Sequence, residues 1–558
     1  AKREGKPASK ALVLRKVVRI LTPGTLTEDS LLDARSANYL VALADVGGQV
    51  GLAACDLSTG AFFLQGLARG ALASSLESLS PREILAPDTF GEDEEARYTL
   101  QPASLFNPEN GRKRLESLFG VGTLEGFGAF SRAEIAAAGA LIDYIDRTQK
   151  GKIPYLSAPK RLNETGLMAI DAATRRSLEL THSLSSGSRK GSLLDCMDDT
   201  LTAPGARLLA AWIAAPLTDP GAINERLSRI EALLADQALC GDLRIYLREV
   251  PDMERALARI TAGRGSPRDL LMIRGGIASA QRICMLLQGA GHAPLMALAG
   301  ALSNQPKASA LADHLREALS EEAPFLARDG GFVREGYHAR LDELRGLKSE
   351  SKRLIAGLQA RYAQDTKIER LKITHNNVLG YFIEVTGKGA DMMFALRERD
   401  PASPYIHRQT MANAARFTTA ELGTLERDLM SADAKALALE LEIFETLVAE
   451  TASAAPVIAE MAGALAALDV ATSLADMAED RGYVRPIVDH SLRFDIEGGR
   501  HPVVEQALKS SGQTFVPNAT KLEGADRLWL LTGPNMAGKS TFLRQSALVA
   551  VLAQAGCY

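Results

Sequence analysis

Apolar and polar residues alternate in short runs over the first part of the chain, which is the pattern of half-buried β-strands. These runs are VLRKVVRIL from residue 13, YLVALADV from residue 39, QVGLAACDL from residue 49 and AFFLQGL from residue 61. Gly47-Gly48 separates two of them in the manner of a hairpin turn. A helix-like run, ALASSLESL, and a strand-like run, EILAP, follow. We therefore predict an α/β domain with an open sheet over residues 13–130.

From residue 131 to about 325 the apolar positions recur at helical spacing in Ala- and Leu-rich segments. Because proline cannot continue the interior of a helix, its positions mark breaks between helices. These breaks fall at Pro204, Pro216, Pro220, Pro251 and Pro267. The pattern predicts a mainly α-helical core.

Two long helices with a strand-rich insert between them are predicted after the core. The first extends from Tyr337 to Leu371, and the insert alternates in Val378–Thr386 and Pro404–Thr410. One side of the first helix consists of Leu341, Leu344, Leu347, Leu354, Ile355, Leu358 and Tyr362. The second has a coiled-coil seam of Leu422, Leu425, Leu429, Ala432, Ala436, Leu439 and Ile443. It contains no Gly or Pro between Thr424 and Ala455 and reaches about 45 Å, which exceeds the width of a DNA duplex.

A phosphate-binding motif lies near the C-terminal end. The apolar run Leu528–Thr532 (LWLLT) leads into GPNMAGKST and then into FLRQSALVAVLAQA, the order of a strand, a G-x-x-x-x-G-K-S/T loop and a helix. In such a loop the backbone amides bind phosphates at the helix N-terminus, the lysine contacts the outer phosphates and the serine binds Mg²⁺. The motif assigns nucleotide binding to Gly533, Pro534, Asn535, Met536, Ala537, Gly538, Lys539, Ser540 (with Mg²⁺) and Thr541. We expect a nucleoside triphosphate as ligand.

Composition restricts the remaining possibilities. The 558 residues are 46% apolar and 24% charged with a net charge of −4, as in a globular protein of several domains, so nucleic-acid contacts must come from local basic patches. Five widely spaced cysteines are typical of reduced, buried thiols. No run reaches the roughly 18 apolar residues that cross a bilayer, and the start AKREGKPASK has no signal core. We expect a soluble cytoplasmic protein without a membrane partner.

Basic residues gather in the predicted β-tip. They are Lys372, Lys388, Arg397, Arg399, Arg408 and Arg416, with hydroxyl and amide groups of Asn376, Asn377, Gln409 and Thr410 nearby. Such groups suit contacts to DNA phosphates. Acidic residues are interleaved at Asp391, Glu398 and Asp400, so composition alone also permits a solvated charged surface.

Two carboxylates in the first domain, Asp45 and Asp56, could face each other across neighbouring strands. Paired carboxylates can hold two metals for nuclease chemistry. No further acidic residues assemble around them in a recognisable order, so solvated turn residues are the favoured interpretation.

Several of these segments together resemble the MutS family of DNA mismatch-repair proteins. They are GPNMAGKST, GRHPVVE from Gly499, the β-tip segments NNVLGYFIEVT and HRQT, and RKVVRILTPGT from Arg15, and the similarity extends over essentially the whole chain. The resemblance implies a homodimeric clamp around mismatched double-stranded DNA. It further implies that ATP and Mg²⁺ convert the clamp to a sliding state that recruits a MutL-type partner, in the nucleoid of the bacterial cytosol.

The resemblance also implies a division into domains. Residues 1–12 would be the tail of the mismatch-recognition domain, 13–130 an RNase H-like connector, 131–372 the helical core and first lever helix, 373–424 a β-rich DNA clamp, 425–480 the second lever helix and return to the core, and 481–558 the N-terminal part of a P-loop ATPase domain. Phe515 and Val516 match the family's adenine-packing pair, since an aromatic face stacks on a purine.

Two features of the family are not matched. The family recognises mispairs with a Phe-x-Glu near its N-terminus, and this chain begins after that motif; Phe382-Ile383-Glu384 has the same letters but falls in the predicted clamp strand. The chain also reaches Tyr558 before an acidic Walker-B strand. We therefore expect no catalytic residue within this chain, and no ATP hydrolysis by these residues alone.

Two other functions remain as alternatives. A MutS-like branch that acts on recombination junctions lacks mispair recognition, and the connector-like domain argues against it. A coiled-coil ATPase of the chromosome-organising kind would place the phosphate loop before its coiled coil, whereas here the loop comes after it.

Overall fold

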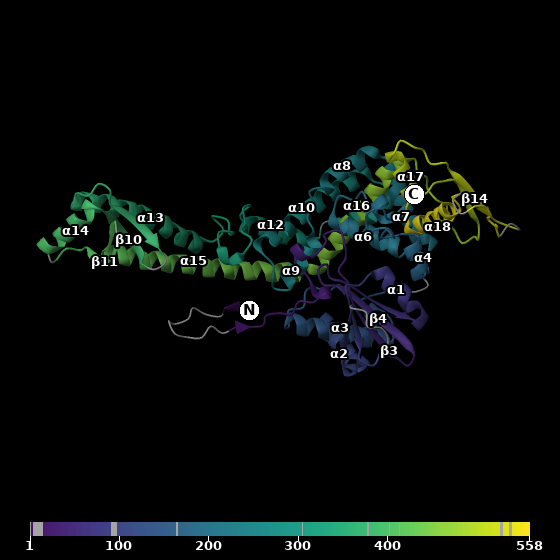
Figure 1. Ribbon diagram of the computed structural model, residues 1–558, viewed down its shortest axis with the longest axis horizontal. Coiled ribbons are helices and arrows are strands. Elements are labelled where there is room, and N and C mark those ends of the chain that lie inside the picture. Colours follow the sequence, from purple (N-terminus) through teal and green to yellow (C-terminus); the bar gives the residue numbers. More distant parts are fainter. Residues whose placement is uncertain are drawn as a thin grey trace. The chain divides into compact units, whose positions relative to one another are not determined.

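A computed structural model of the chain describes residues 2–3, 15–90, 97–162, 166–303, 305–376, 379–400, 402–411, 413–524, 528–534 and 538–558. These residues form two compact units (Figure 1). The first unit comprises Ala1–Gly265, Asp269–Asp313 and Glu450–Tyr558, and the second comprises Ser266–Arg268 and His314–Ala449. The fold is mixed α/β, in agreement with the prediction.

The first unit contains a six-stranded sheet of order β7-β6-β3-β4-β5-β8. Its strands are β3 (Leu40–Val46), β4 (Gln49–Asp56), β5 (Ala61–Leu67), β6 (Glu83–Pro87), β7 (Tyr98–Gln101) and β8 (Lys160–Arg161). The first three form the predicted antiparallel meander, and Gly47 and Gly48 both have the positive φ that a tight hairpin turn requires. β6 is parallel to β3, as a helical crossover through α1 (Leu72–Leu79) permits.

The predicted strand over residues 13–21 is wrong in most of its length. Only Arg15–Lys16 form a two-residue strand, β2, which pairs with β1 (Lys2–Arg3), and residues 13–14 lie outside the described residues. Val17 and Val18 are exposed and have no ladder partner among the described strands. A period-two pattern makes a strand only where a neighbouring strand accepts its hydrogen bonds.

Helices α2 (Pro108–Phe119) and α3 (Arg132–Gln149) cover one face of the sheet. Ser131 starts α3 with a capping box, because its hydroxyl accepts from the Glu134 amide and the Glu134 carboxylate accepts from the Ser131 amide. The buried apolar side of α3 packs on β3 and β4. α3 therefore shares the hydrophobic core of the sheet.

The predicted helical core lies in the first unit, apart from residues 267–268 and 314–318, which belong to the second. Its helices are α4 (Ala172–Ser177), α5 (Leu193–Met197), α6 (Ala203–Ala214), α7 (Pro220–Ala235), α8 (Gln237–Leu247), α9 (Met253–Thr261), α10 (Pro267–Ala290), α11 (Met296–Leu302), α12 (Pro306–Ala318) and α16 (Ala455–Arg481). α16 packs against α6, α7, α8, α9 and α11. α10 and α16 have the length and hydropathy of membrane spans, but 50% and 78% of those windows are buried inside the protein, as in core helices.

The second unit contains the two predicted long helices, α13 (Ala339–Thr366) and α15 (Ala420–Ser453). Between them lies a four-stranded sheet of order β11-β12-β10-β9. Its strands are β9 (Lys372–Asn376), β10 (Gly380–Thr386), β11 (Ile406–Met411) and β12 (Ala414–Thr418). The sheet also has a helix that the sequence analysis missed, α14 (Lys388–Arg399), which packs on β10 through Met393. On α13 the predicted apolar side is only partly buried, because Leu347 and Leu354 are each 50% exposed.

The C-terminal part of the first unit consists of β13 (Phe494–Gly499), α17 (Pro502–Ser510), β14 (Asn518–Leu522) and α18 (Lys539–Ala555). β13 and β14 pair in antiparallel fashion. The predicted strand Leu528–Thr532 is wrong for this structure, because no described strand pairs with it and Leu528 and Leu530 are 87% and 88% exposed. Trp529 packs its ring on Phe542 of α18 instead.

Candidate functional site

The phosphate-binding motif adopts a glycine-dependent loop ahead of a long helix. Gly533 and Gly538 have φ values of +144° and +82°, which only glycine adopts without strain. Gly538 is the N-cap of α18, and Lys539 is its first residue. The Lys539 ammonium donates to the carbonyl of Gly533, so its side chain folds back across the loop. The motif residues Asn535, Met536 and Ala537 lie outside the described residues.

The N-terminus of α18 has the features of an anion site. No described side chain caps it, so the first-turn amides are available to a ligand. The helix dipole adds partial positive charge at this end, and the Lys539 ammonium adds a full one. Ser540 is exposed in the first turn, and Thr541 is half-buried beside it. Together these groups fit a phosphate chain and its Mg²⁺.

The predicted adenine pair lies on the segment that enters β14. Phe515 is half-buried, whereas Val516 is 75% exposed. The Asn518 side-chain amide donates to the Val516 carbonyl at 3.0 Å and to the Gln545 side chain of α18 at 3.4 Å. Asn518 therefore connects the predicted adenine segment to the helix that follows the phosphate loop.

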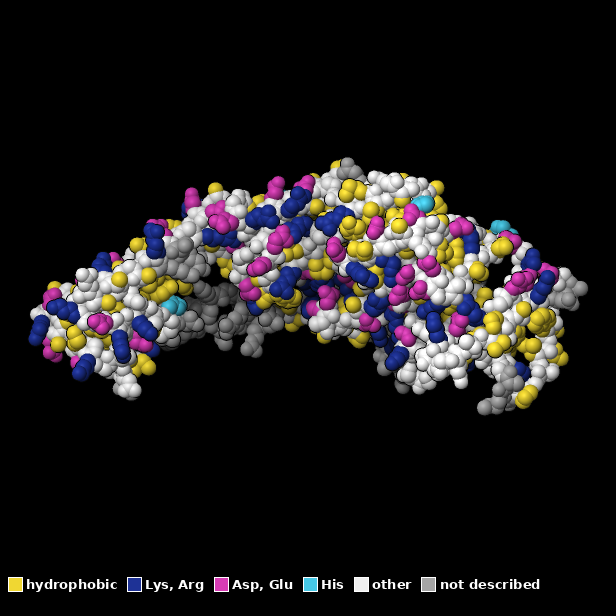
Figure 2. All heavy atoms as spheres, turned by 90° about the horizontal axis from the view of Figure 1, so that it is seen from above, with side chains coloured by type: hydrophobic (Ala, Val, Ile, Leu, Met, Phe, Trp, Pro, Cys, Tyr) yellow, Lys and Arg dark blue, Asp and Glu magenta, His cyan; other side chains and the backbone are white. Residues whose placement is uncertain are grey.

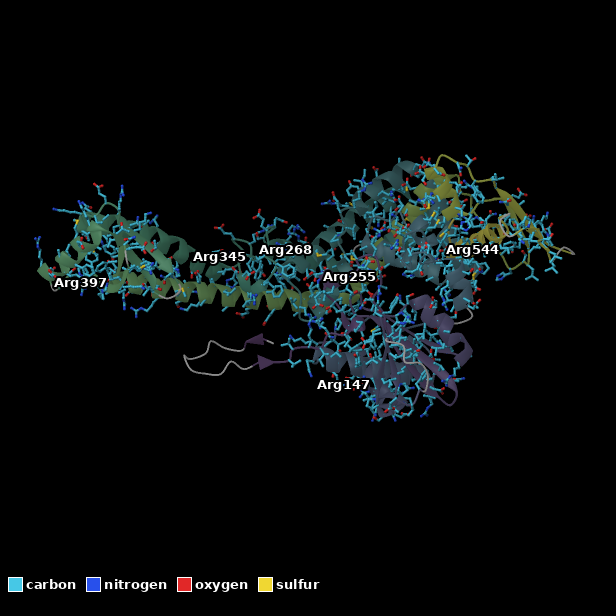
Figure 3. All side chains as sticks on the ribbon, viewed as in Figure 1. Arg147, Arg255, Arg268, Arg345, Arg397 and Arg544 are labelled. Atoms are coloured by element: carbon cyan, nitrogen blue, oxygen red, sulfur yellow. The ribbon has the colours of Figure 1, made fainter. Side chains whose placement is uncertain are left out.

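The predicted DNA-contacting residues lie on three elements of the second unit. Lys388, Arg397 and Arg399 belong to α14, Arg408 to β11 and Arg416 to β12. Figure 2 shows lysine and arginine side chains at the end of the second unit, with acidic ones between them, and Figure 3 labels Arg397 on α14. All but Arg416 are exposed, and no described carboxylate forms an ion pair with these exposed residues. They are therefore available to phosphates.

Arg416 differs from the other four. Its guanidinium donates to Glu384 at 3.0 Å and to Gln409 at 3.1 Å, and it lies 4.6 Å from the centre of the Phe382 ring. Only 19% of its side chain is exposed. These contacts connect neighbouring strands, so Arg416 supports the sheet more than it serves an outside ligand.

The structure decides two other hypotheses from the sequence, one on Phe382 as a mispair reader and one on Asp45 and Asp56 as a metal site. Phe382 is only 3% exposed beneath Arg416, so it has no access to a base pair, as we inferred from its place in the clamp strand. Asp45 and Asp56 lie at opposite ends of the β3-β4 hairpin, because Asp45 pairs with Val50 and Asp56 with Ala61. They do not face each other, and the described residues contain no metal-ligand cluster.

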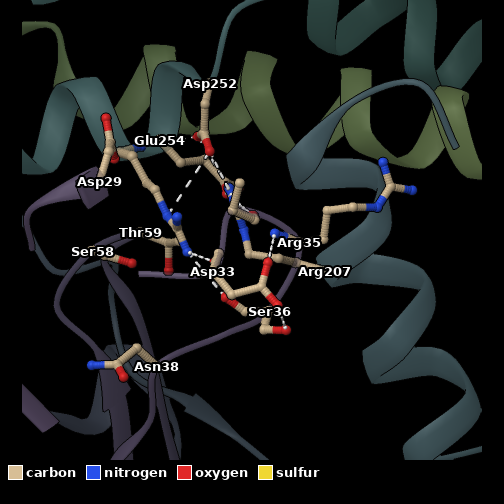
Figure 4. A network of polar contacts seen from close by, with 12 residues as sticks. Asp29, Asp33, Arg35, Ser36, Asn38, Ser58, Thr59, Arg207, Asp252 and Glu254 are labelled. Carbon is tan, nitrogen blue, oxygen red and sulfur yellow. Dashed lines mark hydrogen bonds and ion pairs between the residues drawn. The ribbon is translucent and has the colours of Figure 1, made fainter. Parts of the chain in front are cut away.

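A buried polar network that the sequence analysis missed joins the chain ahead of the sheet to the helical core (Figure 4). Arg207 of α6 donates to Asp252 at 2.7 Å and 3.0 Å and to Glu254 at 2.7 Å. It also donates to the carbonyl of Ala34 at 2.8 Å. Burial acts to raise the pKa of Asp252, but the Arg207 guanidinium outweighs it and holds that pKa below its ordinary value.

Arg255 of α9 completes this connection. Its guanidinium donates to the carbonyls of Asp33 and Ser36 at 2.9 Å and 3.0 Å, and only 2% of the residue is exposed. Isolated arginines give no spacing signal in a sequence, so only the tertiary structure reveals this network.

The helix α14 had a usable signal, namely a run of helix formers that ends in Arg397 and Arg399.

Comparison with known families gives matches along the chain. The model of MutS domain II matches residues 38–157, that of MutS domain III matches residues 173–475, and that of MutS domain V matches residues 529–558. The domain V match contains the described part of the phosphate loop and α18.

Individual relatives agree with these matches. The DNA mismatch repair protein MutS of Rhodopseudomonas palustris (strain HaA2) is 49% identical over 571 residues, which include 99% of this chain and 62% of the relative. A protein of the same name from Nitrobacter winogradskyi is 47% identical over 576 residues, with coverages of 99% and 64%. The chain thus spans less than two thirds of the length of these relatives. Because the model of MutS domain III alone matches more than half of the residues, the chain belongs to the MutS family.

Proposed function

We propose that this chain is the DNA-clamping and nucleotide-binding part of a mismatch-repair protein. The observation that carries the proposal is the combination of a phosphate-loop helix in the first unit with exposed cations around the small sheet of the second unit. A homodimer of such chains would embrace double-stranded DNA that contains mispaired bases. ATP would then convert the clamp to a sliding state that recruits a MutL-type partner.

The nucleotide site would consist of the phosphate-loop residues 533–541 and the pair Phe515 and Val516. The α18 amides and Lys539 would hold the phosphates, and Ser540 would hold Mg²⁺. Bound Mg²⁺ supplies charge neutralisation between the phosphate oxygens. DNA-dependent ATP hydrolysis belongs to this proposal at the level of the family.

The DNA contacts would come from Lys388, Arg397, Arg399 and Arg408. Phosphate contacts of this kind position a protein on DNA without specifying sequence. We assign Arg416 a supporting role for the sheet on the basis of its contacts to Glu384 and Gln409.

We also propose a domain division that follows the packing. An RNase H-like connector would end after α3, the helical core would include α4 to α12 and α16, and α13 and α15 would be the lever helices of a clamp made of β9 to β12 and α14. The P-loop domain would begin after α16. A location in the bacterial cytosol near the nucleoid fits a DNA-repair function.

Binding measurements test the proposal directly. Fluorescence anisotropy with a labelled duplex should show an affinity that falls steeply between 50 and 200 mM salt, on the order of tenfold or more for several phosphate contacts. A salt-independent affinity would remove the clamp assignment. Calorimetric titration with ATP should give binding to the chain and none to Lys539→Ala, with the exposed Lys509→Ala of α17 as a matched control that retains it. Equal ATP affinity in all three proteins would refute the phosphate loop.

Neither alternative function is favoured by a specific observation. A chromosome-organising coiled-coil ATPase would have its phosphate loop ahead of the coiled coil, whereas α18 follows α13 and α15. A junction-binding relative would prefer four-way DNA over duplex DNA in the same anisotropy assay, which gives a direct comparison.

A further inference from the structure

The C-terminal end of the phosphate-loop helix is closed partly by the helix itself. Four carbonyls at the end of any α-helix lack partners within it. In α18 the Gly556 amide donates to the Ala553 carbonyl at 3.1 Å, and the Cys557 amide donates to the Leu552 carbonyl at 2.9 Å. Gly556 has a φ of +83°, which permits this turn. Two of the last four carbonyls are thereby satisfied.

The other two carbonyls are satisfied by the helical core. The Leu217 amide, just beyond α6, donates to the Gln554 carbonyl at 3.0 Å. The Arg226 guanidinium, on α7, donates to the Ala555 carbonyl at 2.8 Å. Both donors belong to the first unit, as α18 does. The end of the phosphate-loop helix is therefore docked on α6 and α7.

Arg226 is a half-buried cation without an acidic partner among the described residues. Its guanidinium carbon lies 3.7 Å from the centre of the Trp212 ring, and no described carboxylate forms an ion pair with it. The neighbouring Glu225 pairs with Arg229 instead. Burial lowers the pKa of Arg226 to about 10, which reflects the cost of placing an unpaired cation there. The partial negative charge at the C-terminus of α18 and the face of Trp212 offset that cost.

Helix α18 also contacts β14, the strand that follows the predicted adenine pair. Besides the bond between Asn518 and Gln545, the Thr520 and Ser546 hydroxyls lie 3.2 Å apart. α18 and β14 are therefore joined by side chains along the helix. A shift of this helix on the core would therefore act on β14 as well as on the phosphate-loop end of α18.

We propose that Arg226 is the positioning residue that transmits nucleotide binding from α18 to the helical core. It sits at the opposite end of the helix whose N-terminus would hold the phosphates, and it contacts both the helix and the core through one guanidinium. Loss of Arg226 should then leave nucleotide affinity nearly unchanged but weaken the effect of nucleotide on DNA binding. This inference rests on the proposed nucleotide and DNA sites.

The test measures the thermodynamic coupling between the two ligands. The dissociation constant of a labelled duplex is determined by anisotropy without ATP and with saturating ATP, for the unaltered chain and for Arg226→Gln. We expect the unaltered chain to show a ratio of about fivefold or more, which is a typical coupling between two sites, and the ratio of Arg226→Gln to approach one. Calorimetry without DNA should give ATP affinities for the two proteins within about twofold of each other.

Three further variants separate positioning from general stability. Arg229→Gln removes a cation from the same helix and should retain the full ratio, because Arg229 pairs only with Glu225 among the described carboxylates. Arg226→Lys keeps the charge and should restore part of the ratio. Gly556→Ala leaves the charge in place but would bring a methyl group to 2.7 Å from Arg226 Cβ and Cδ at a φ of +83°, so it should lower both the ratio and the stability of the α18 end. If Arg226→Gln does not fold, Arg226→Lys and Gly556→Ala provide the same comparison.

Each result of the coupling test leads to a different conclusion. The inference would be overturned if Arg226→Gln kept the ratio of the unaltered chain, or if the unaltered chain itself gave a ratio of one. Either result would leave nucleotide and DNA binding in place. Equal losses of ATP affinity and of coupling would overturn it too, because Arg226 would then support the nucleotide site itself. Absence of ATP binding to the unaltered chain would instead refute the proposed function on which the inference rests.

Discussion

The carboxylate of Asp469 in α16 accepts the hydroxyl of Thr202 at 2.6 Å. It also accepts the backbone amides of Thr202 and Leu201 at 2.8 Å and 2.9 Å. Thr202 is the N-cap of α6, so one buried side chain of α16 fixes the start of another core helix. Because three donors converge on Asp469, its removal would leave several buried polar groups without partners.

We expect Asp469→Asn to destabilise the helical core by about 1–3 kcal/mol, because an amide NH₂ would face donors that now meet a carboxylate oxygen. Thermal unfolding followed by circular dichroism checks this. Asp480→Asn, on an exposed turn of the same helix, is the control and should shift the transition little. Equal melting temperatures of the two variants would contradict the structural role of Asp469.

Gly139→Ala should destabilise the sheet domain. A Cβ atom at Gly139 would lie 2.2 Å from the Cα atom of Gly111 on α2, so the two helices would have to move apart at a cost of about 1–3 kcal/mol. Gly275 of α10 offers a matched control, because a Cβ there meets nothing within 4 Å. Gly275→Ala should be neutral or stabilising by roughly 0.5–1 kcal/mol. Urea unfolding of the two variants measures both changes, and a Gly139→Ala protein as stable as the parent would count against this packing.

The clamp residues should separate into two classes in DNA binding. Replacing Arg397 or Arg408 by Gln should weaken duplex binding and reduce the slope of log affinity against log salt by about 0.9 for each phosphate that is no longer neutralised. Arg416→Gln should instead lower the melting temperature, since Arg416 contacts Glu384 and Gln409. Arg282→Gln is the control for removal of a charge, because Arg282 of α10 forms an exposed pair with Glu249 in the segment after α8. A steeper or unchanged slope in Arg408→Gln would remove Arg408 from the DNA interface.

His501 should make the stability of the C-terminal segment depend on pH. Its Nδ1 atom accepts the Val504 amide at 3.4 Å and so caps α17 as a neutral ring. Burial, and then the nearby Arg544, lower the pKa of His501 below its ordinary 6.5. The folded state therefore binds the proton less readily than the unfolded chain, and its stability falls as the pH drops below 6.5 toward the folded-state pKa.

The measurement for His501 is the melting temperature between pH 7.5 and 5.5, compared with His501→Asn. Asparagine also caps helices but does not titrate in this range. We expect the parent chain to lose more stability on acidification than the variant. Parallel pH profiles would show that His501 is not responsible.

Arg207→Gln should be among the most destabilising single changes in the first unit. It would leave the carboxylates of Asp252 and Glu254 buried without their cation, at a cost of roughly 3–5 kcal/mol. The pKa of Asp252 lies below 3.8 in the folded chain, so the contribution of its pair with Arg207 is complete above that pH and is lost as the pH falls through the folded-state pKa.

The difference in stability between Arg207→Gln and the parent should therefore shrink on acidification. Urea unfolding at pH 7 and below pH 3.8 measures it, with Arg244→Gln in an ion pair to the exposed Asp199 as the comparison. A difference that grows at low pH would contradict the assigned direction.

Local sequence was sufficient for several elements. The β3-β4 hairpin follows from alternation around Gly47-Gly48, and α13 and α15 follow from long apolar periodicity with few helix breakers. The phosphate loop also follows from local sequence, because its glycines, lysine and serine lie within nine consecutive residues. In each case the information that fixes the element lies within one continuous segment.

Other predictions failed because the deciding partner is distant in sequence. Leu528–Thr532 has the composition of a strand, but no described strand pairs with it. Residues 17–21 likewise have no partner strand among the described residues, although the Ile20 amide donates to the Thr148 carbonyl at 2.8 Å. Arg416, which the sequence grouped with the phosphate contacts, is held by Glu384 of a neighbouring strand. Periodicity and charge do not specify which segments meet.

The sequence by itself therefore determined the β3-β4-β5 meander, the long helices, the phosphate-loop motif and the resemblance to a family, because each depends on residues close together along the chain. The tertiary structure alone decided that α3 packs on the sheet, that Asp45 and Asp56 are apart, and that Arg226 closes the end of α18. These facts depend on packing between segments up to 329 residues apart, and such packing is settled by the shapes and charges of whole surfaces.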